Sequence, residues 1–529
     1  MKYIFTSALL VLAVSNFFSQ KQSFKNDYIL SECNGEIPAI YNVNPLTFAK
    51  THKDKSITNE FYENSYYNLA SLMKSGKILF GDEISVYLNT LVQHILKKSG
   101  KENLSGIIKV YVVKSSYINY YTRIDGSIFI SNGLLAQLGN EAQLAFVLSH
   151  EIVHYEEKHN AQSFEENKAL VKSYTRNYGA IEDFKNDIET NSKEKEYEAD
   201  KKGLEIFNRA GYGTEDAKAA LQVLKYAHLP FDDLAFDKTF FNRENYTIPP
   251  SYFKFVADKE NEKEEKEKSD EIIDARIDKF KGSNAKTGTT YQLDKAEFEY
   301  ISMKAKFENQ YINLVQRRFI RAVYESYVLK KSYPNNTYLN ECIAKGVYGI
   351  SKMKNYFDRT SVSSEDFVDE QPKGNTFDDA SLVLWNLLGN SSKVELNVLA
   401  TKLLLETKDE KLMPYIEDLM KDLTMDMEFD ISNFKTTVVA ELDTVKGENG
   451  KDSVVLKNNT FKVLDSLGYA KLSKVEKIVY TQKKAVYDQQ LATLDTNSGE
   501  TINLSGEINK DYYLTALIKE LKDTTFANK

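Results

Sequence analysis

The chain has 529 residues, enough for several domains, and its 42% hydrophobic and 28% charged residues are typical of a globular protein with a substantial core. Acidic residues outnumber basic ones by 77 to 69, so the formal net charge is −8. This balance argues against a protein that binds nucleic acid, because no basic excess is present to neutralise phosphates. Histidine is the informative residue type, since three of the six, His150, His154 and His159, fall within ten residues.

The first 19 residues have the pattern of a secretory signal peptide. Lys2 provides a positive start, and residues 4–18 form a mostly apolar stretch that is shorter than the roughly 20 residues needed to span a bilayer. We therefore expect cleavage and export, to the periplasm or the medium, with no transmembrane helix in the mature protein. The two cysteines, Cys33 and Cys342, could pair in an oxidising compartment, but two distant thiols do not establish a disulfide.

Two short strands and a capped helix lead up to the histidines. Ile107–Val113 and Ser127–Ser131 are rich in β-branched or aromatic residues and are bounded by turn residues, which indicates strands. Asn140 is a suitable helix N-cap, and a glutamine follows three residues later, so we expect a helix from Glu141 to His159. A second long helical region is expected over residues 162–210.

The second half of the chain has a different pattern. A run of mixed charges without apolar residues covers residues 258–270 and is typical of a connector. Beyond it, residues 322–350 have the pattern of a helix, a turn and a second helix, as in stacked helical repeats. The expected segments are a signal peptide (1–19), a first domain (20–257), a charged linker (258–285), helical repeats (286–428) and a C-terminal region of unknown fold (429–529).

The segment HEIVH has the spacing of a metal site. On a helix, His150 and His154 project from one face about one turn apart, so two imidazoles can bind one Zn²⁺ ion. Glu151 leans toward the same point from the side, where a general base must lie to take a proton from an attacking water. A chance match to this motif in a chain of this length has a probability on the order of one in a hundred. The segment therefore predicts a zinc hydrolase rather than a structural zinc site, in which Glu151 would have no purpose.

A hydrolytic zinc site needs a third protein ligand and an open position. On a continuous helix His159 is rotated by about 140° from His154, so we expect it to be structural or at the surface rather than a ligand. Glu196 and Asp200 are four residues apart in the next helical region, so both can face the first helix. Glu196 could complete the ligand set and Asp200 could accept the free N–H of an imidazole, although spacing alone does not separate Glu196 from two neighbouring glutamates.

Residues 57–225 resemble metallopeptidase family forty-eight, which includes the HtpX protease and the CAAX prenyl endopeptidases, and in particular its soluble exported branch. The shared elements are the Gly-Leu-Leu turn (133–135), the Asn-Glu-Ala-x-Leu-Ala lead-in (140–145), HEIVH with a later histidine, and the Glu-x-x-Ala-Asp block (196–200). The resemblance implies a mainly α (α+β) chain with a zincin-like (gluzincin) peptidase domain, a small β-sheet and a helical-repeat region. It also implies one zinc ion per chain with Glu196 as the third ligand, and tetratricopeptide-like repeats after the peptidase domain.

Two elements of this family differ here. The family's His-Pro is absent, and Ala275-Arg276-Ile277 resembles the Arg-Ile that follows it, so Arg276 is the candidate for stabilising the transition state. Asn119 resembles the residue that opens the substrate-facing strand, but the small residue after it is replaced by Tyr120. Stabilisation of the transition state by a side chain is therefore the least determined part of the site.

These features predict a zinc-dependent endopeptidase of the cell envelope that cleaves misfolded or unassembled exported proteins. His150, His154 and Glu196 would hold the metal. Glu151 would activate water and pass its proton to the leaving amine, while the strand Ser127–Ser131 would align the polypeptide by β-addition. An alternative is a holdase or assembly factor whose C-terminal helices bind envelope protein clients, with low or latent proteolysis.

Overall fold

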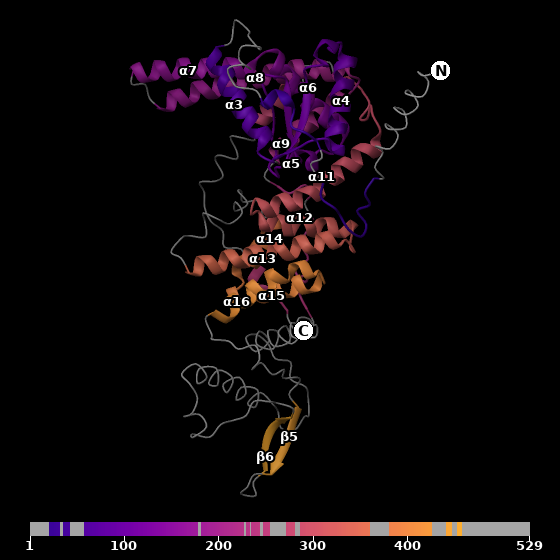
Figure 1. Ribbon diagram of the computed structural model, residues 1–529, viewed down its shortest axis with the longest axis vertical. Helices are drawn as coiled ribbons and strands as arrows, with labels where there is room; N and C mark the ends of the chain where they lie inside the picture. The colour runs from indigo at the N-terminus through magenta and orange to yellow at the C-terminus, as the bar shows by residue number, and fades with distance from the viewer. Residues whose placement is uncertain are drawn as a thin grey trace, which may run out of the picture. The chain divides into compact units, whose positions relative to one another are not determined.

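The structure is a computed structural model of the chain (Figure 1). It describes residues 21–31, 35–42, 58–177, 181–226, 229–232, 234–243, 247–253, 271–280, 286–359, 380–425, 441–446 and 452–457. The predicted signal peptide, Cys33, the charged run over residues 258–270 and residues 458–529 lie outside the described residues. None of the helices in the described part of the chain is long and apolar enough to cross a membrane.

The first part of the chain contains a mixed four-stranded sheet with the strand order β1-β2-β4-β3. The central strands β2 and β4 are parallel, and the edge strands β1 and β3 pair with them antiparallel. Both strands expected from the sequence are present, although β2 begins two residues later than predicted. The bounds are β1 (Ile78–Leu79), β2 (Lys109–Val113), β3 (Tyr120–Thr122) and β4 (Ser127–Ser131).

The strand order corrects one expectation about substrate binding. β4 was expected to align a polypeptide by β-addition, but it is paired on one side with β2 and on the other with β3. A strand with both edges paired has no free backbone N–H and C=O groups to offer to another chain. The edge beside β4 is β3, and any added strand on this side of the sheet must pair there.

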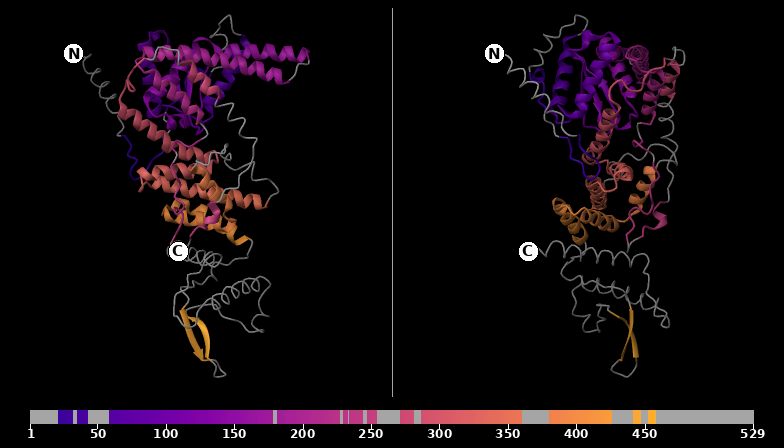
Figure 2. Two further views of the ribbon diagram at one scale, coloured as in Figure 1. Left: turned by 180° about the vertical axis from the view of Figure 1, so that it is seen from behind. Right: turned by 90° about the vertical axis from the view of Figure 1, so that its right-hand side faces the viewer.

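Helices pack around the sheet (Figure 1), and the mainly α, α+β class expected from the sequence is confirmed. α4 packs against β2 and α6 packs against β3, while α7 and α8 lie side by side as a long helical pair (Figure 2). The elements are η1 (Ala39–Asn42), α3 (Asn59–Lys74), α4 (Glu83–Ser99), η2 (Glu102–Leu104), α5 (Asn132–Gln137), α6 (Glu141–Glu156), α7 (His159–Asn177), α8 (Ile181–Arg209), α9 (Thr214–Lys225), α11 (Lys295–Val315) and α12 (Phe319–Ser332).

α6 is the helix that carries the HEIVH segment. Asn140 caps it as predicted, because its side chain accepts a hydrogen bond of 2.9 Å from the backbone N–H of Gln143. Most of the helix is buried, which is the pattern of a central helix rather than a surface helix. The prediction that it continues to His159 is wrong: the helix ends at Glu156, because Lys158 adopts a left-handed backbone with φ 57°. His159 then begins α7.

Glu141, at the start of α6, joins several elements through a fully buried carboxylate. It accepts hydrogen bonds from the hydroxyls of Tyr87 at 2.7 Å and Tyr212 at 2.6 Å, and from the backbone N–H of Gln292 at 2.7 Å. Negative charge is also favourable at a helix N-terminus. Glu141 therefore links α4, the end of α8 and the segment before α11 to the helix of the site.

Replacing Glu141 with alanine should lower the free energy of unfolding by about 3 kcal/mol, because two buried hydroxyls and two partly buried backbone N–H groups, of Gln292 and Leu293, would lose their acceptor. Thermal melting followed by circular dichroism measures this, with Glu194→Ala as the control, since Glu194 is exposed on α8. A Glu141→Ala variant that melts together with the wild type would contradict the structural role given to this carboxylate.

The chain divides into two compact units. The first comprises Met1–Leu234, Ala257–Cys342 and Glu370–Asp379, and the second comprises Ala235–Val256, Ile343–Asp369 and Ala380–Lys529. The first unit therefore continues past the linker expected at 258–285. The reason is visible in α11, whose Phe298, Ile301 and Ala305 are buried in the same core as the apolar faces of α4 and α6.

The second unit, taken by itself, contains short helices and a β-hairpin. α13 runs from the first unit into this one, and with α12 it forms the helix, turn and helix expected over residues 322–350. Asn336 in the turn accepts a hydrogen bond of 3.0 Å from the backbone N–H of Leu339 and so caps α13. The elements are η3 (Pro250–Phe253), α13 (Thr337–Arg359), α14 (Ala380–Asn390), α15 (Lys393–Glu406), η6 (Glu410–Leu412), α16 (Met413–Met425), β5 (Glu441–Lys446) and β6 (Asp452–Lys457).

Candidate metal centre and active site

Two helices, α6 and α8, bring three candidate metal ligands to one point. His150 and His154 lie one turn apart on α6, with their Nε2 atoms 2.9 Å apart. Glu196 of α8 faces them, with Oε2 3.4 Å from Nε2 of His150 and Oε1 3.4 Å from Nε2 of His154. The three residues predicted as ligands are therefore neighbours in space.

The spacing of these donor atoms fits a zinc ion. Zinc binds imidazole nitrogen and carboxylate oxygen at about 2.0–2.2 Å in a tetrahedral arrangement, which places its donor atoms roughly 3.3 Å from one another. The observed separations of 2.9 to 3.4 Å bracket this value. The helices can approach this closely because α8 has Gly203 at the crossing, where a Cβ atom would lie 3.0 Å from the Cα of His150.

The charge of the site also fits a cation. Burial opposes protonation of His150, but the adjacent carboxylates of Asp200 and Glu196 outweigh it and raise the pKa of His150 to about 10. Burial likewise works against ionisation of Glu196, yet its contacts with His150 and His154 hold the pKa of Glu196 well below its usual range. Ionised carboxylates packed against two imidazoles favour a further positive charge among them, and a divalent ion would supply it.

Glu151 lies beside the ligands and is buried, with 3% of its surface exposed. Its Oε2 has no hydrogen-bond partner among the described residues, and the backbone of Thr122 in β3 hydrogen-bonds to the carboxylate. Burial raises the pKa of Glu151 to about 7. A carboxylate with an unpartnered oxygen and a pKa near neutrality is suited to accept a proton and release it again.

Asp200 and Arg276 support His150 from behind. Oδ1 of Asp200 lies 3.0 Å from Nδ1 of His150, and Arg276 donates to both Asp200 oxygens, from Nε at 2.7 Å and from Nη2 at 2.8 Å. Nη1 of Arg276 also lies 3.2 Å from Oε2 of Glu196. Arg276 is 7% exposed, and its guanidinium is occupied by carboxylates. This geometry favours a role for Arg276 in orienting the candidate ligands, and the predicted role in stabilising the transition state stays a prediction.

Two residues of the site were not assigned to it from the sequence. His159 lies against His154, with their Nδ1 atoms 2.9 Å apart, because the chain turns at Lys158. Tyr120 lies beside His150, with the ring centroids 6.0 Å apart in an edge-to-face contact. Burial raises the pKa of Tyr120, so its hydroxyl stays protonated at neutral pH. For Tyr120, the sequence signal was the replacement of the small residue that the family has at this position. For His159, nothing in the sequence indicates the turn at Lys158 that places it in the site.

β3 offers an edge next to these side chains. Alternate residues of this edge, Asn119, Tyr121 and Arg123, hydrogen-bond to β4 through their backbones. The residues between them, Tyr120 and Thr122, therefore turn their backbone N–H and C=O groups away from the sheet. The outward C=O of Thr122 is bound by the side chain of Asn160 at 2.8 Å. Tyr120 is then the position of β3 at which an added strand would pair, beside His150.

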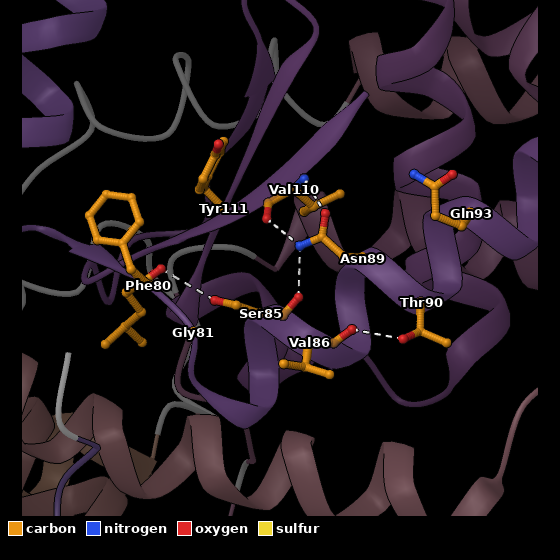
Figure 3. Close-up of a pocket in the computed structure, with 10 residues that line it drawn as sticks. Phe80, Gly81, Ser85, Val86, Asn89, Thr90, Gln93, Val110 and Tyr111 are labelled. Atoms are coloured by element: carbon orange, nitrogen blue, oxygen red, sulfur yellow. Dashed lines mark hydrogen bonds between the residues drawn. The ribbon is translucent and has the colours of Figure 1, made fainter. Parts of the chain in front are cut away.

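The part of β2 that β1 does not cover is closed to an added strand. A hollow between α4 and β2 is lined mainly by apolar atoms of residues such as Phe80, Val86 and Tyr111 (Figure 3). Within it, the amide of Asn89 donates to the C=O of Val110 at 2.8 Å and accepts from its N–H at 3.0 Å. This side chain satisfies the backbone of β2 in place of a strand, so the hollow is not a second site for β-addition.

A buried glutamate beside two histidines and a carboxylate on paired helices is the arrangement expected of a metal-dependent hydrolase. Residues 85–254 match Peptidase family M48, a family of metallopeptidases, so the chain contains a domain of this family, as the sequence motifs indicated. The matched residues include the three candidate ligands and Glu151 but not Arg276.

One curated relative is the beta-barrel assembly-enhancing protease of Yersinia pestis. It is 26% identical over 116 residues, which cover 22% of this chain and 23% of the relative. The chain therefore matches less than a quarter of the length of this relative.

Proposed function

We propose that the protein is a zinc-dependent endopeptidase of the cell envelope that cleaves misfolded or unassembled exported proteins. The observation that carries this proposal is the convergence of His150, His154 and Glu196 at 2.9 to 3.4 Å beside the buried Glu151. Two imidazoles and one carboxylate are the ligand set of hydrolytic zinc sites.

The catalytic roles follow from the positions of the residues. His150, His154 and Glu196 would hold zinc, which when bound polarises the scissile carbonyl and lowers the pKa of water. Glu151 takes the proton of the attacking water on Oε2 and passes it to the nitrogen of the leaving amine, which needs a carboxylate whose pKa lies near neutrality. Asp200, held by Arg276, keeps the ring of His150 in place.

Substrate alignment is proposed for β3. A polypeptide that adds to this edge strand pairs with the outward backbone groups of Tyr120 and so passes beside His150. Tyr120, whose ring lies beside His150 and whose hydroxyl stays protonated, is proposed as a second donor, besides Arg276, for developing negative charge. Backbone pairing of this kind does not depend on side-chain identity, which suits an enzyme for unfolded chains.

Envelope location and client class rest on two further observations. The first 19 residues have the pattern of a signal peptide, and a curated relative, which matches 22% of the chain, is named for beta-barrel assembly. The helices after α11 are proposed as the surface that binds client proteins, by the expected similarity to helical repeats.

The test measures metal content and cleavage of casein by the full mature chain. The wild type should bind about one zinc ion and cleave casein. Glu196→Gln should weaken zinc binding by more than about a hundredfold. Mutating a residue that only hydrogen-bonds to a zinc ligand already lowers metal affinity by about 10–100-fold, and loss of a ligand should cost more. Glu194→Gln, an exposed glutamate on the same helix, is the matched control and should leave both properties unchanged.

The outcomes separate the two candidate functions. A wild type that holds zinc, cleaves nothing and suppresses aggregation of an unfolded protein would support the holdase alternative. A Glu196→Gln variant that retains full zinc affinity would show that the third ligand is assigned incorrectly.

A further inference from the structure

His159 contacts a candidate zinc ligand although it offers no atom to the metal. It is the first residue of α7, and the left-handed Lys158 before it turns the chain so that its ring meets His154. The rings pack edge to face with centroids 4.9 Å apart, and their Nδ1 atoms lie 2.9 Å apart. His159 is 2% exposed, so this is a hydrogen bond between two ring nitrogens away from bulk water.

The direction of this hydrogen bond follows from the geometry of the metal site. Nε2 of His154 faces His150 and Glu196, so binding a metal requires a lone pair there and places the ring proton on Nδ1. That N–H then donates to Nδ1 of His159, whose own proton must lie on Nε2. Nε2 of His159 is 3.2 Å from Oε2 of Glu198, which accepts it. A single arrangement of protons therefore satisfies both hydrogen bonds.

The far end of this chain of hydrogen bonds is fixed by charge. The other oxygen of Glu198, Oε1, lies 2.6 Å from Nζ of Lys202, one turn further along α8. Lys202 also reaches Glu157, at the end of α6, at 2.5 Å. The carboxylate that receives the proton of His159 is thus held by a residue that ties α6 to α8.

We infer that His159 is a positioning residue of the metal site, which orients the ring of His154, keeps its proton on Nδ1 and thereby raises the affinity for the divalent ion. His150 has a direct carboxylate, Asp200, in the corresponding place at 3.0 Å. For His154 the same support is given by the imidazole of His159, which is held in turn by the carboxylate of Glu198. The inference rests on the proposed function and adds to it a residue outside the ligand set.

The test compares two substitutions of His159 in the full mature chain. His159→Phe keeps a flat ring but can neither accept nor donate, whereas His159→Asn can accept from His154 through Oδ1 and donate to Glu198 through Nδ2. Zinc affinity is measured by competition with a chelator, which does not depend on activity. We expect a loss of about 10–100-fold for the phenylalanine variant and a loss of only a few-fold for the asparagine variant.

Glu198→Gln provides a second route if the phenylalanine variant does not fold, because Glu198 is partly exposed and its replacement is mild. It should weaken zinc binding several-fold relative to Glu194→Gln. Unchanged zinc affinity in His159→Phe, or an equal loss in both His159 variants, would overturn the inference. Failure of the wild type to bind zinc would instead overturn the proposed function, so the two failures are distinguishable.

Discussion

Replacing Glu151 with glutamine should leave the metal bound and reduce peptide cleavage by roughly 100- to 10,000-fold, the range for loss of a general base. Glutamine has the shape of glutamate but cannot accept a proton from water. The candidate ligands His150, His154 and Glu196 are untouched, so metal content should stay that of the wild type. The turnover number and zinc content are measured on the same sample, with Glu194→Gln as the control.

The same substitution should stabilise the metal-free protein, and the effect should depend on pH. Burial raises the pKa of Glu151 from an ordinary value of 4.5 to about 7. Between these values the unfolded chain releases a proton that the folded chain retains, so this carboxyl group lowers stability as pH rises through that window. The full penalty, present above pH 7, is about 3 kcal/mol.

Metal-free Glu151→Gln should therefore exceed the wild type in free energy of unfolding by about 3 kcal/mol near pH 8, and by about 1 kcal/mol or less near pH 5. Urea denaturation at the two pH values, in the presence of a chelator, measures the difference. A variant that is inactive and also no more stable than the wild type at pH 8 would show that Glu151 is not held in a costly buried state. Lower activity together with lower metal content would show instead that Glu151 helps to hold the ion.

The two candidate histidine ligands could be predicted from the sequence because their relation depends on local geometry. His150 and His154 share a helix face by the helical period alone, and the cap at Asn140 fixes where that helix begins. Glu196 and Asp200 also share a face of α8, but spacing alone does not separate Glu196 from its neighbouring glutamates, and the choice rests on the family resemblance. The packing of α6 against α8 brings the two pairs together. The roles of these residues remain predictions that the proposed substitutions test.

The remaining features depend on single turns or on distant contacts. The position of His159 is set by the backbone of one residue, Lys158, which spacing on a continuous helix cannot anticipate. The order of strands decides that β3 rather than β4 forms the edge, and strand order is a property of the folded sheet. Arg276 is a candidate site residue from the sequence, but its partner Asp200 lies 76 residues earlier in the chain, and a contact over that separation depends on the folded structure.

Replacing Arg276 with glutamine should be strongly destabilising. Asp200 is 2% exposed and keeps its charge in the core. Burial acts to raise the pKa of Asp200, but hydrogen bonds from Arg276 and His150 outweigh this effect and hold the pKa below its usual value. Removing one partner of a buried ion pair leaves the other uncompensated, which costs about 3–5 kcal/mol. The loss should be largest at neutral pH and should shrink as the pH falls below the ordinary pKa of 3.8, where Asp200 is protonated in the unfolded chain.

A double substitution separates this pair from general damage to the fold. Arg276→Gln combined with Asp200→Asn removes both charges, so it should cost less than the sum of the two single changes. Arg276→Lys should give an intermediate loss, because an ammonium group keeps the charge but not the paired hydrogen bonds to both Asp200 oxygens. If the double variant lost as much stability as the sum of the single variants, Arg276 and Asp200 would act independently. The ring of His150 would then be oriented by Asp200 without help from the guanidinium.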